Sequence, residues 1–400
     1  MFVETRLSAW ITGIHQQIAL PLRLELWNGQ HIDFSSETPR VTIRLPDVSA
    51  ARYLLKPSLA SLGTAYVEGA IEVKGHARDM IAVVNALART TLTPRRKFSR
   101  FLPGMAHNKQ KDAAAIRYHY DVSNDFYAQF LDPNLVYSCA YFENGDEDLE
   151  TAQLKKIDHI LRKIALRPHH TLLDIGCGWG ALVIRAAQQY RVRCVGVTLS
   201  ENQCALARLR VRRAGLEHLV DIRLQDYRDV RGQFDRITSV GMFEHVGVRH
   251  LPEYFGAVHR LLAPDGVVMN RGITSTDAHN GQTPYGGGEF IHKYVFPHGE
   301  LAHIGSVLKA MQQGGLEAVD VENLRRHYAR TCAIWTDNFE LRGERLRELA
   351  GDKRYRIWHV YLAGCSHAFE HDWISLYQIV GQKAGQRSAT LPWSRHHIYP

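Results

Sequence analysis

Apolar and polar residues alternate in two short segments near the start of the chain, as they do in half-buried β-strands. These segments are Leu22–Leu26 and Val41–Leu45, and the pair Asn28-Gly29 between them is a typical turn sequence. The spacing of apolar residues in Asp79–Leu87 instead predicts a helix. We therefore expect a small α+β unit in the first quarter of the chain, and its sequence contains no recognisable catalytic constellation.

The pattern changes after residue 112, where strand-like and helix-like segments follow one another in turn. The predicted strands are Thr171–Ile175, Arg193–Thr198, Val220–Leu224, Arg236–Val240 and Gly266–Met269, and the predicted helices are Ala181–Tyr190, Glu201–Arg213 and Pro252–Leu262. Such alternation is typical of an α/β fold, in which helices connect the strands of a parallel sheet. In these sheets the ligand binds beyond the carboxyl ends of the strands.

A basic segment separates the two regions. Residues 93–112 carry the helix breakers Pro94, Pro103 and Gly104, with arginines and lysines between and after them. A chain of 400 residues fits two or three domains. We predict two, a smaller N-terminal α+β domain over residues 1–105 and an α/β domain over residues 106–400.

Composition excludes several classes of protein. A hydrophobic share of 45% excludes a disordered or low-complexity chain. No apolar run approaches the ~18 residues of a membrane-spanning helix, and Met1–Trp10 lacks a signal-peptide pattern. Six cysteines without a CxxC pair indicate a reduced, cytoplasmic protein. The adjacent pairs His169-His170 and His396-His397 lack the spacing of metal ligands, so we predict no metal site.

The net charge of +8 is compatible with nucleic acid, with an anionic membrane surface, or with solubility alone. Composition does not choose among these three explanations.

The strongest local signal is a glycine-rich turn after the first strand of the α/β region. Asp174 is followed there by Gly176, Gly178 and Gly180, a Gly-x-Gly-x-Gly spacing. Glycines let a backbone turn sharply and approach a ligand closely. A dinucleotide site requires GxGxxG and an acidic residue ~20 positions later, so this spacing favours S-adenosylmethionine. The alternative is a turn that only packs the helix on the strand.

The second strand ends without the acidic residue that usually binds the ribose of such cofactors. Its last residues run from Gly196 to Ser200, and Thr198 and Gln203 are the side chains able to form hydrogen bonds to the ribose hydroxyls.

These residues, with several others, resemble the cyclopropane-fatty-acyl-phospholipid synthase family, which includes the mycolic acid cyclopropane synthases. The resemblance covers about residues 115–385, and the N-terminal part is similar to the additional domain of the longer bacterial members. The motifs that carry it are Tyr120-Asp121-x-x-Asn124-Asp125-Phe126-Tyr127, Tyr137-Ser138-Cys139-Ala140-Tyr141-Phe142, Leu173–Gly180, Gly196–Gln203, Phe234–Ile237, Gly241–Gly247, Lys293–Pro297, His327–Trp335 and Tyr361–Cys365. Each motif is weak alone, but together and in this order they are specific.

The resemblance implies S-adenosylmethionine-dependent chemistry on the cis double bond of a phospholipid acyl chain. The double bond attacks the methyl group of the cofactor, which requires close alignment of the two reactants. The resulting carbocation requires a dry pocket and is stabilised by aromatic faces. Candidates for that role, each with core packing as the alternative, are Tyr137, Tyr141, Phe142, Phe243 and Trp335. A base then removes a proton from the added methyl group, and the cyclopropane ring closes.

The resemblance also implies roles for individual residues. Bicarbonate is the implied base, held by Cys139, Glu244, Tyr328 and the backbone of Ile273, and Cys365 matches a cysteine of the family's active site. For Glu244, Tyr328 and Cys365 the alternatives are a surface carboxylate, a half-buried tyrosine and a small buried hydrophobic residue. The predicted cofactor-binding residues are Tyr137, Ser138, Asp174, Gly176, Cys177, Gly178, Gly180, Thr198, Leu199, Gln203, Asp226 and Tyr227.

One position departs from the family pattern. When the segment after Asp265-Gly266 is aligned with the family pattern without a gap, Arg271 occupies the position of the family's bicarbonate-binding histidine. Its guanidinium is able to bind an oxyanion through two hydrogen bonds, but it does not accept a proton at neutral pH. The glycine-rich segment 280–288 is a second local peculiarity. The product is therefore open between a cyclopropane ring and a methyl-branched or unsaturated chain.

Three hypotheses follow. The first is transfer of a methylene or methyl group to an unsaturated acyl chain of a phospholipid, by a cytoplasmic enzyme at the inner face of the cell membrane. On this hypothesis the net charge and the segment Arg95–Phe101 serve contact with anionic headgroups, and nucleic acid is not a partner.

The second hypothesis keeps the cofactor, but the protein acts on a small amine or natural product. The third is a lipid- or nucleic-acid-binding module on an inactive methyltransferase fold. Whether the chain forms a homodimer is left open.

Overall fold

The computed structural model describes residues 2–91, 122–279, 283–284, 287–296, 299–385 and 390–399. The chain divides into two compact units. The first unit comprises Met1–Leu102, Gln282–Pro297 and Cys332–Trp373, and the second comprises Pro103–Gly281, His298–Thr331 and Ile374–Pro400. The segment 93–112 that separates the predicted domains, the residues Tyr120 and Asp121, and most of the glycine-rich segment 280–288 lie outside the described residues.

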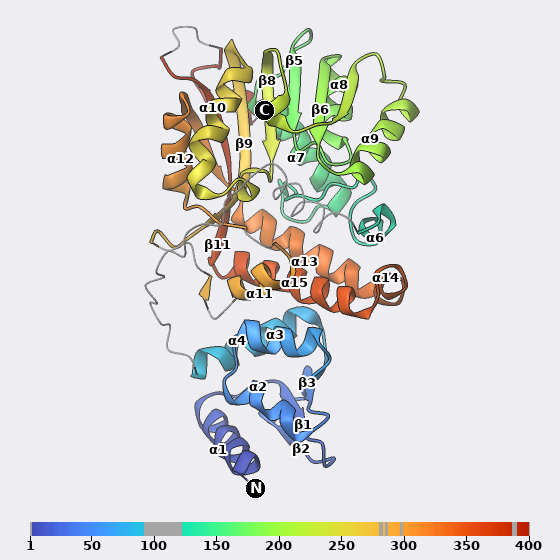
Figure 1. Cartoon of the computed structure of the whole chain (residues 1–400), viewed down its shortest axis with the longest axis vertical. Coiled ribbons are helices and arrows are strands. Elements are labelled where there is room, and N and C mark those ends of the chain that lie inside the picture. Colours follow the sequence, from blue (N-terminus) through green and yellow to red (C-terminus); the bar gives the residue numbers. More distant parts are fainter. Residues whose placement is uncertain are drawn as a thin grey trace. The chain divides into compact units, whose positions relative to one another are not determined.

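The second unit is built on a seven-stranded sheet, and Figure 1 shows its strands and their helices. The strands, in chain order, are β5 (Thr171–Ile175), β6 (Arg193–Thr198), β7 (Val220–Leu224), β8 (Phe234–Val240), β9 (Leu262–Ser275), β10 (Leu316–Asn323) and β11 (Ile374–Lys383). Their order across the sheet is β10-β11-β9-β8-β5-β6-β7. All neighbours from β9 to β7 are parallel, whereas β11 is antiparallel to both β9 and β10. The order reverses at β5, where such sheets bind ligands.

Helices cover both faces of this sheet. On one face α7 (Leu149–Lys163), α8 (Ala181–Tyr190) and α9 (Glu201–Arg213) bury an apolar core, and on the other α10 (Leu251–Leu261) and α12 (Ile304–Gln313) bury a second one. Figure 1 shows α10 and α12 beside β9, with α8 and α9 beside β6. The unit also holds the short helix α6 (Asn124–Ala128) and the start of α13 (Arg325–Leu341).

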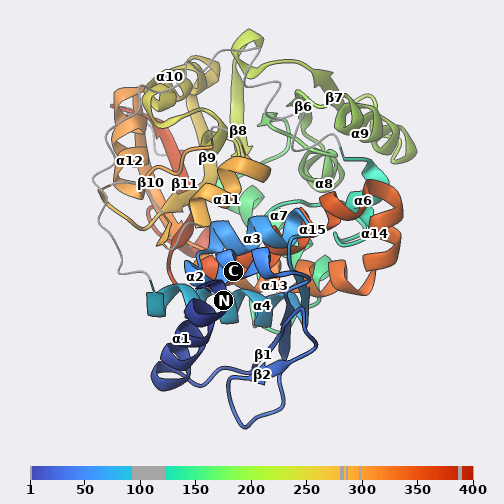
Figure 2. The ribbon, with the colours of Figure 1, turned by 60° about the horizontal axis from the view of Figure 1, so that its bottom comes forward.

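The first unit combines a small sheet with helices from three parts of the chain. Its strands are β1 (Leu22–Glu25), β2 (His31–Asp33), β3 (Val41–Arg44) and β4 (Glu72–Lys74), in the order β2-β1-β3-β4. Figure 2 shows β1 and β2 with helix α1 near them. The helices of this unit are α1 (Phe2–Gln17), α2 (Ala51–Leu55), α3 (Leu59–Val67), α4 (Ala77–Thr91), α11 (Gly287–Tyr294), the end of α13, α14 (Gly343–Ala350) and α15 (Asp352–Glu370).

The predicted α/β class is confirmed, and many of the predicted elements have the expected bounds. Segments β5, β6, β7, α8 and α9 begin and end where the pattern predicts, whereas β9 extends to Ser275 instead of ending at Met269. Because of this extension, Arg271 and Ile273 lie inside a buried strand. The first change of compact unit falls between Leu102 and Pro103, and two later segments, Gln282–Pro297 and Cys332–Trp373, group with the N-terminal segment. The division into domains at residue 105 stays a prediction.

None of the helices within the described residues combines the length and the apolar character needed to cross a membrane.

Candidate active site

The glycine-rich loop after β5 has a backbone that only glycine adopts readily. Gly176, Gly178 and Gly180 have φ angles of +80°, +54° and +82°, in the left-handed region where a Cβ is strained. The loop is fixed to the neighbouring strand because the N–H groups of Gly176 and Cys177 both donate to the Val197 carbonyl, at 3.0 Å. The turn therefore presents backbone atoms at the carboxyl end of the sheet, as the sequence predicted.

A cavity lies in front of this loop, beyond the carboxyl ends of β5, β6 and β8. The predicted cofactor-binding residues that line it are Tyr137, Ser138, Asp174, Gly176, Cys177, Gly178, Thr198, Leu199, Gln203 and Tyr227. Gly180 and Asp226 are not among its lining residues. Gly180 is instead the residue that precedes helix α8 as its N-cap. The Asp226 carboxylate is bound by the Arg228 guanidinium, with 2.7 Å between Oδ2 and Nη2. The structure thus places most of the predicted cofactor-binding residues around one cavity, and the roles of these residues stay predictions.

The two side chains predicted to bind the ribose bind each other. The Thr198 hydroxyl donates to Gln203 Oε1 at 2.8 Å, and the Ser200 N–H donates to the Thr198 oxygen at 3.2 Å. The Gln203 carbonyl is therefore used, while its amide N–H groups form no hydrogen bond with other described residues. We expect this amide group, rather than the Thr198 hydroxyl, to reach a ligand in the cavity.

A second group of buried polar side chains adjoins the cavity. Gly241 lines the cavity, and its N–H donates to the Arg271 carbonyl at 2.8 Å. Glu244 Oε1 accepts from the Ile273 N–H at 2.7 Å, and the Arg271 guanidinium carbon lies 5.0 Å from the centre of the Tyr328 ring. The structure therefore joins residues that are up to 84 positions apart in the sequence, from Glu244 to Tyr328.

Burial and charge have opposite effects on this group. Burial raises the pKa of the Glu244 carboxyl above its ordinary value, while the Ile273 N–H and the Arg271 charge oppose that rise. Burial also raises the pKa of the Cys139 thiol to about 11, against the charges of Arg271 and Lys156. Cys139 is thus a neutral thiol at physiological pH, which suits a hydrogen-bonding role better than a nucleophilic one.

Several atoms of this group lack a hydrogen-bond partner among the described residues. They are Glu244 Oε2, Nε and Nη2 of Arg271, and both amide atoms of Gln378. Gln378 on β11 is in register with Arg271 on β9, so the two side chains lie on one face of the sheet. Buried polar atoms are normally paired, and leaving one unpaired costs about 1–3 kcal/mol. We interpret this concentration of unpaired atoms as a candidate site for a polar ligand.

Sequence reasoning missed Gln378, and it also missed Lys156, which lines the cavity. For Lys156 a signal was available. In α7 the positions that face the core include the polar residues Gln153 and Lys156 among apolar ones. A polar residue on the apolar face of an amphipathic helix indicates a specific buried partner.

Not all the aromatic candidates are free to face a carbocation. Both faces of the Tyr141 ring are covered, by His159 at 4.3 Å and by His327 at 4.9 Å between ring centres. The Arg330 guanidinium lies 5.1 Å from the centre of the Phe142 ring. Tyr137 lines the cavity. Tyr137 is therefore the better placed of these three rings.

Cys365 and Trp335 belong to the first unit, in α15 and α13. Cys365 is not among the residues that line the cavity. Burial raises the pKa of its thiol to about 12, so the side chain is a neutral thiol. The residue is half-buried, and both its active-site role and the packing alternative stay predictions.

Gly272, next to Arg271, leaves room for an aromatic ring. A Cβ at this position would lie 2.3 Å from Cε1 of Phe243, which is 2% exposed. We expect Gly272→Ala to destabilise the protein by about 1–3 kcal/mol, because the ring has no free space into which to move. Thermal unfolding measures the effect, and Phe243→Leu in the same chain should restore part of the loss. Full stability of the single Gly272→Ala variant would contradict this packing.

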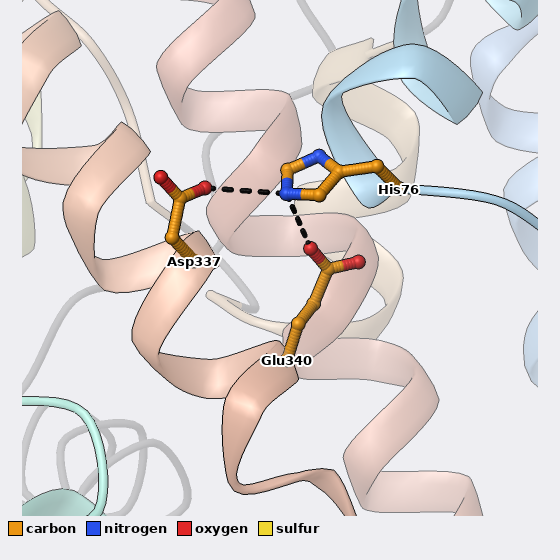
Figure 3. Close-up of side chains that lie close together, drawn as sticks. All are labelled: His76, Asp337 and Glu340. Atoms are coloured by element: carbon orange, nitrogen blue, oxygen red, sulfur yellow. Dashed lines mark ion pairs between the residues drawn. The ribbon is translucent and has the colours of Figure 1, made fainter. Parts of the chain in front are cut away.

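Figure 3 shows the one grouping of metal-ligand side chains found among the described residues, which lies in the first unit. His76 Nε2 lies 2.7 Å from Glu340 Oε2 and 3.3 Å from Asp337 Oδ1. The Arg78 guanidinium also approaches Asp337 Oδ1, at 3.4 Å. The two carboxylates therefore already contact a histidine or an arginine, and we interpret the grouping as a network of polar side-chain contacts. The prediction that the protein has no metal site stays a prediction.

The sheet order, the reversal at β5 and the glycine-rich loop define an α/β protein with a nucleotide-cofactor site of the methyltransferase type. Comparison with known proteins agrees. Residues 107–379 match the model of the family described as mycolic acid cyclopropane synthetase, and residues 9–96 match a domain of unknown function. The chain belongs to the mycolic acid cyclopropane synthetase family and is a member of the S-adenosylmethionine-dependent methyltransferases that modify lipids.

Individual relatives extend this result. A probable fatty acid methyltransferase of Pseudomonas putida is 43% identical over 393 residues, which are 96% of this chain and 98% of the relative. The cyclopropane-fatty-acyl-phospholipid synthase of Escherichia coli is 38% identical over 262 residues, 66% of each chain. The mycolic acid cyclopropane synthase CmaA1, solved with S-adenosylhomocysteine and CTAB, superimposes with a TM-score of 0.65 at 36% identity, covering 68% of this chain and 98% of that one.

Proposed function

We propose that the protein transfers a one-carbon unit from S-adenosylmethionine to the double bond of an unsaturated fatty acyl chain of a phospholipid. The observation that carries this proposal is the buried group around Glu244 and Arg271, which adjoins the cofactor cavity through Gly241. An alkene needs no base to activate it, but its carbocation needs a proton acceptor and the exclusion of water. The unpaired atoms of Glu244 and Arg271 offer a place to hold a proton acceptor, and the burial of this group excludes water.

The proposed reaction balances as follows. When bound, S-adenosylmethionine supplies an electrophilic methyl group. The π electrons of the alkene form the new carbon–carbon bond to this methyl group, and the electrons of the sulfur–methyl bond remain on sulfur. The carbocation then loses one proton, so that the acyl chain gains CH2 overall. In this reaction the residues of the protein position the two reactants and hold the group that receives the proton.

The residues around Glu244 also fit a bicarbonate ion. The unpaired Nε and Nη2 of Arg271 are donors for its oxygens, and Glu244 Oε2 is an acceptor for its hydroxyl group. When bound, bicarbonate supplies a proton acceptor. In the proposal, Arg271 and the Tyr328 hydroxyl hold it, and Glu244 orients it. Removal of a proton from the transferred methyl group gives a cyclopropane ring.

A methyl-branched acyl chain is the second candidate product, and Arg271 is the observation that favours it. The family's histidine at this position accepts protons at neutral pH, whereas a guanidinium does not. With a weaker base near the transferred methyl group, the cation loses its proton from a neighbouring chain carbon instead, and the product is a methyl-branched chain that still contains a double bond. The Pseudomonas putida relative, 43% identical, bears the name of a fatty acid methyltransferase, which supports this candidate.

We further propose peripheral contact with an anionic membrane surface, because the substrate resides in the bilayer. A net charge of +8 supports such contact, at about 1 kcal/mol for each basic residue near the surface. Vesicle binding should weaken steeply as salt is added.

Lipid analysis of cells that express the protein tests the proposal. We expect unsaturated acyl chains to be converted into chains one CH2 heavier, and Glu244→Ala to prevent the conversion. Unchanged acyl chains in both strains would overturn the lipid substrate. Turnover of a soluble amine without lipid would then favour the small-molecule hypothesis.

A further inference from the structure

Lys156 is a buried lysine whose positive charge has no ion-pair partner among the described residues. It lies on α7 and is 3% exposed, yet it is one of the residues that line the cofactor cavity. Its ammonium donates one hydrogen bond, to the Ser138 hydroxyl at 2.9 Å. A buried ammonium has three hydrogen-bond donors, and burying it without a charged partner destabilises the folded protein. The position therefore demands an explanation that the proposed transfer reaction does not supply.

The lysine is held in place by the loop that it contacts. One turn earlier on α7, the Gln153 amide donates to the carbonyls of Val136 and Ser138, at 3.1 and 2.7 Å. Residues three positions apart lie on the same face of a helix. Together the two side chains fix Val136–Ser138, a stretch of the cavity wall to which Lys156 also belongs.

A buried carboxylate also lines this cavity. Asp174, at the end of β5, is 3% exposed, and its Oδ1 accepts a hydrogen bond from the Thr238 hydroxyl at 2.7 Å. It forms no ion pair with another described residue. The cavity thus presents one buried cation and one buried anion, each held by a hydroxyl group. Such a pair of charges complements an amino acid head, which carries a carboxylate and an ammonium.

We propose that the Lys156 ammonium binds the carboxylate of the methionine part of S-adenosylmethionine, with Asp174 facing the amino group of the same part. Ser138 then holds the lysine in position rather than being the principal ligand of the carboxylate. This inference rests on the cofactor dependence of the family and is independent of the lipid substrate proposed above.

The protonation of Lys156 is consistent with this role. Burial lowers the pKa of its ammonium to about 7, and the charge of Arg271 lowers it further, while Asp132, Cys139 and Asp174 raise it. An anion bound next to the ammonium raises the pKa again. The bound complex therefore takes up a proton when it forms above neutral pH, and cofactor affinity falls as the pH rises from about 7 to about 9.

Binding calorimetry with two ligands tests the proposal. S-adenosylhomocysteine carries the amino acid head, whereas methylthioadenosine has the same nucleoside and sulfur without it. We expect Lys156→Met to weaken S-adenosylhomocysteine about 10- to 100-fold, the usual contribution of a hydrogen bond to a charged group, and to leave methylthioadenosine within about 2-fold. Lys155→Met, at the neighbouring half-buried lysine that pairs with Glu143 and Glu147 and does not line the cavity, is the matched control and should change neither affinity.

Each other outcome contradicts the proposal. An equal loss for both ligands would mean that Lys156 only shapes the cavity wall, and an unchanged affinity for S-adenosylhomocysteine would mean that another group binds the carboxylate. Methylthioadenosine binding also reports whether the variant is folded. In buffers of different ionisation enthalpy, the wild type should take up protons on binding S-adenosylhomocysteine at about pH 8, and Lys156→Met should take up fewer. None of these measurements depends on the lipid reaction.

Discussion

Replacing Glu244 by glutamine is expected to lower turnover of an unsaturated phospholipid by about 100- to 1000-fold while S-adenosylhomocysteine still binds. In the wild type the Ile273 N–H donates to Glu244 Oε1 at 2.7 Å. The side-chain oxygen of glutamine is able to accept the same hydrogen bond, so we expect the fold around β9 to be preserved. It removes the negative charge and the acceptor Oε2, which has no partner among the described residues. A loss of this size is typical when a positioned acid–base group is removed.

Turnover with labelled cofactor and calorimetry with S-adenosylhomocysteine measure the two effects separately. Glu253→Gln is the control, because Glu253 is exposed on α10 and, within the part of the chain that the structure describes, its carboxylate contacts only His250. Cofactor affinity within about 3-fold of wild type is expected for both variants. An active Glu244→Gln enzyme, or one that loses cofactor binding in proportion to turnover, would contradict the proposed role of Glu244 in the proton-removal step.

Replacing Arg271 by histidine is expected to change which proton the carbocation loses. With cofactor carrying a trideuterated methyl group, a proton lost from that group leaves two deuterium atoms in the product, as in a ring. A proton lost from the chain leaves three. Histidine accepts protons near neutral pH and arginine does not. Arg271→His should therefore raise the ratio of the product with two deuterium atoms to the product with three by about tenfold, which is equivalent to ~1.4 kcal/mol between the competing steps.

Mass analysis of the product measures this ratio, and Arg271→Met is the matched variant. Methionine removes the charge next to Glu244 without adding a base, so turnover should fall while the ratio stays near that of the wild type. The ratio should depend on added bicarbonate more strongly in Arg271→His than in the wild type. A substitution that weakens S-adenosylhomocysteine binding and leaves the ratio unchanged would place Arg271 in the cofactor site instead.

The first half of the α/β unit was predictable because its boundaries carry strong local signals. Three glycines with positive φ separate β5 from α8, and the Ser200 hydroxyl caps α9 by accepting from the Gln203 N–H. The end of β9 was not predictable in the same way. Asn270, Arg271 and Gly272 interrupt the apolar pattern, yet all of β9 beyond Asp265 is buried or nearly so. Polar residues inside a buried strand are the mark of a site, where function overrides the pattern.

The candidate site divides in a similar way. The cofactor loop is contiguous in sequence, so its residues could be identified together. Glu244, Arg271 and Tyr328 come together only through the sheet and α13, and their association came from the resemblance, not from spacing. Gln378 was missed because nothing local reveals that a glutamine is buried; tertiary packing alone decides it. Lys156 could have been found, because it lies among the core-facing positions of the amphipathic helix α7. The compact grouping of Cys332–Trp373 with the N-terminal segment was hidden for the same reason.

The most direct test of the central claim uses purified protein, S-adenosylmethionine with a labelled methyl group, and vesicles of an anionic phospholipid. One set of vesicles carries a cis double bond in its acyl chains, and the matched set is fully saturated. We predict that label enters the acyl chains of the unsaturated phospholipid, making them one CH2 heavier, and that the saturated phospholipid stays unlabelled. Label in both sets, in the headgroup, or in neither would contradict transfer to an acyl double bond.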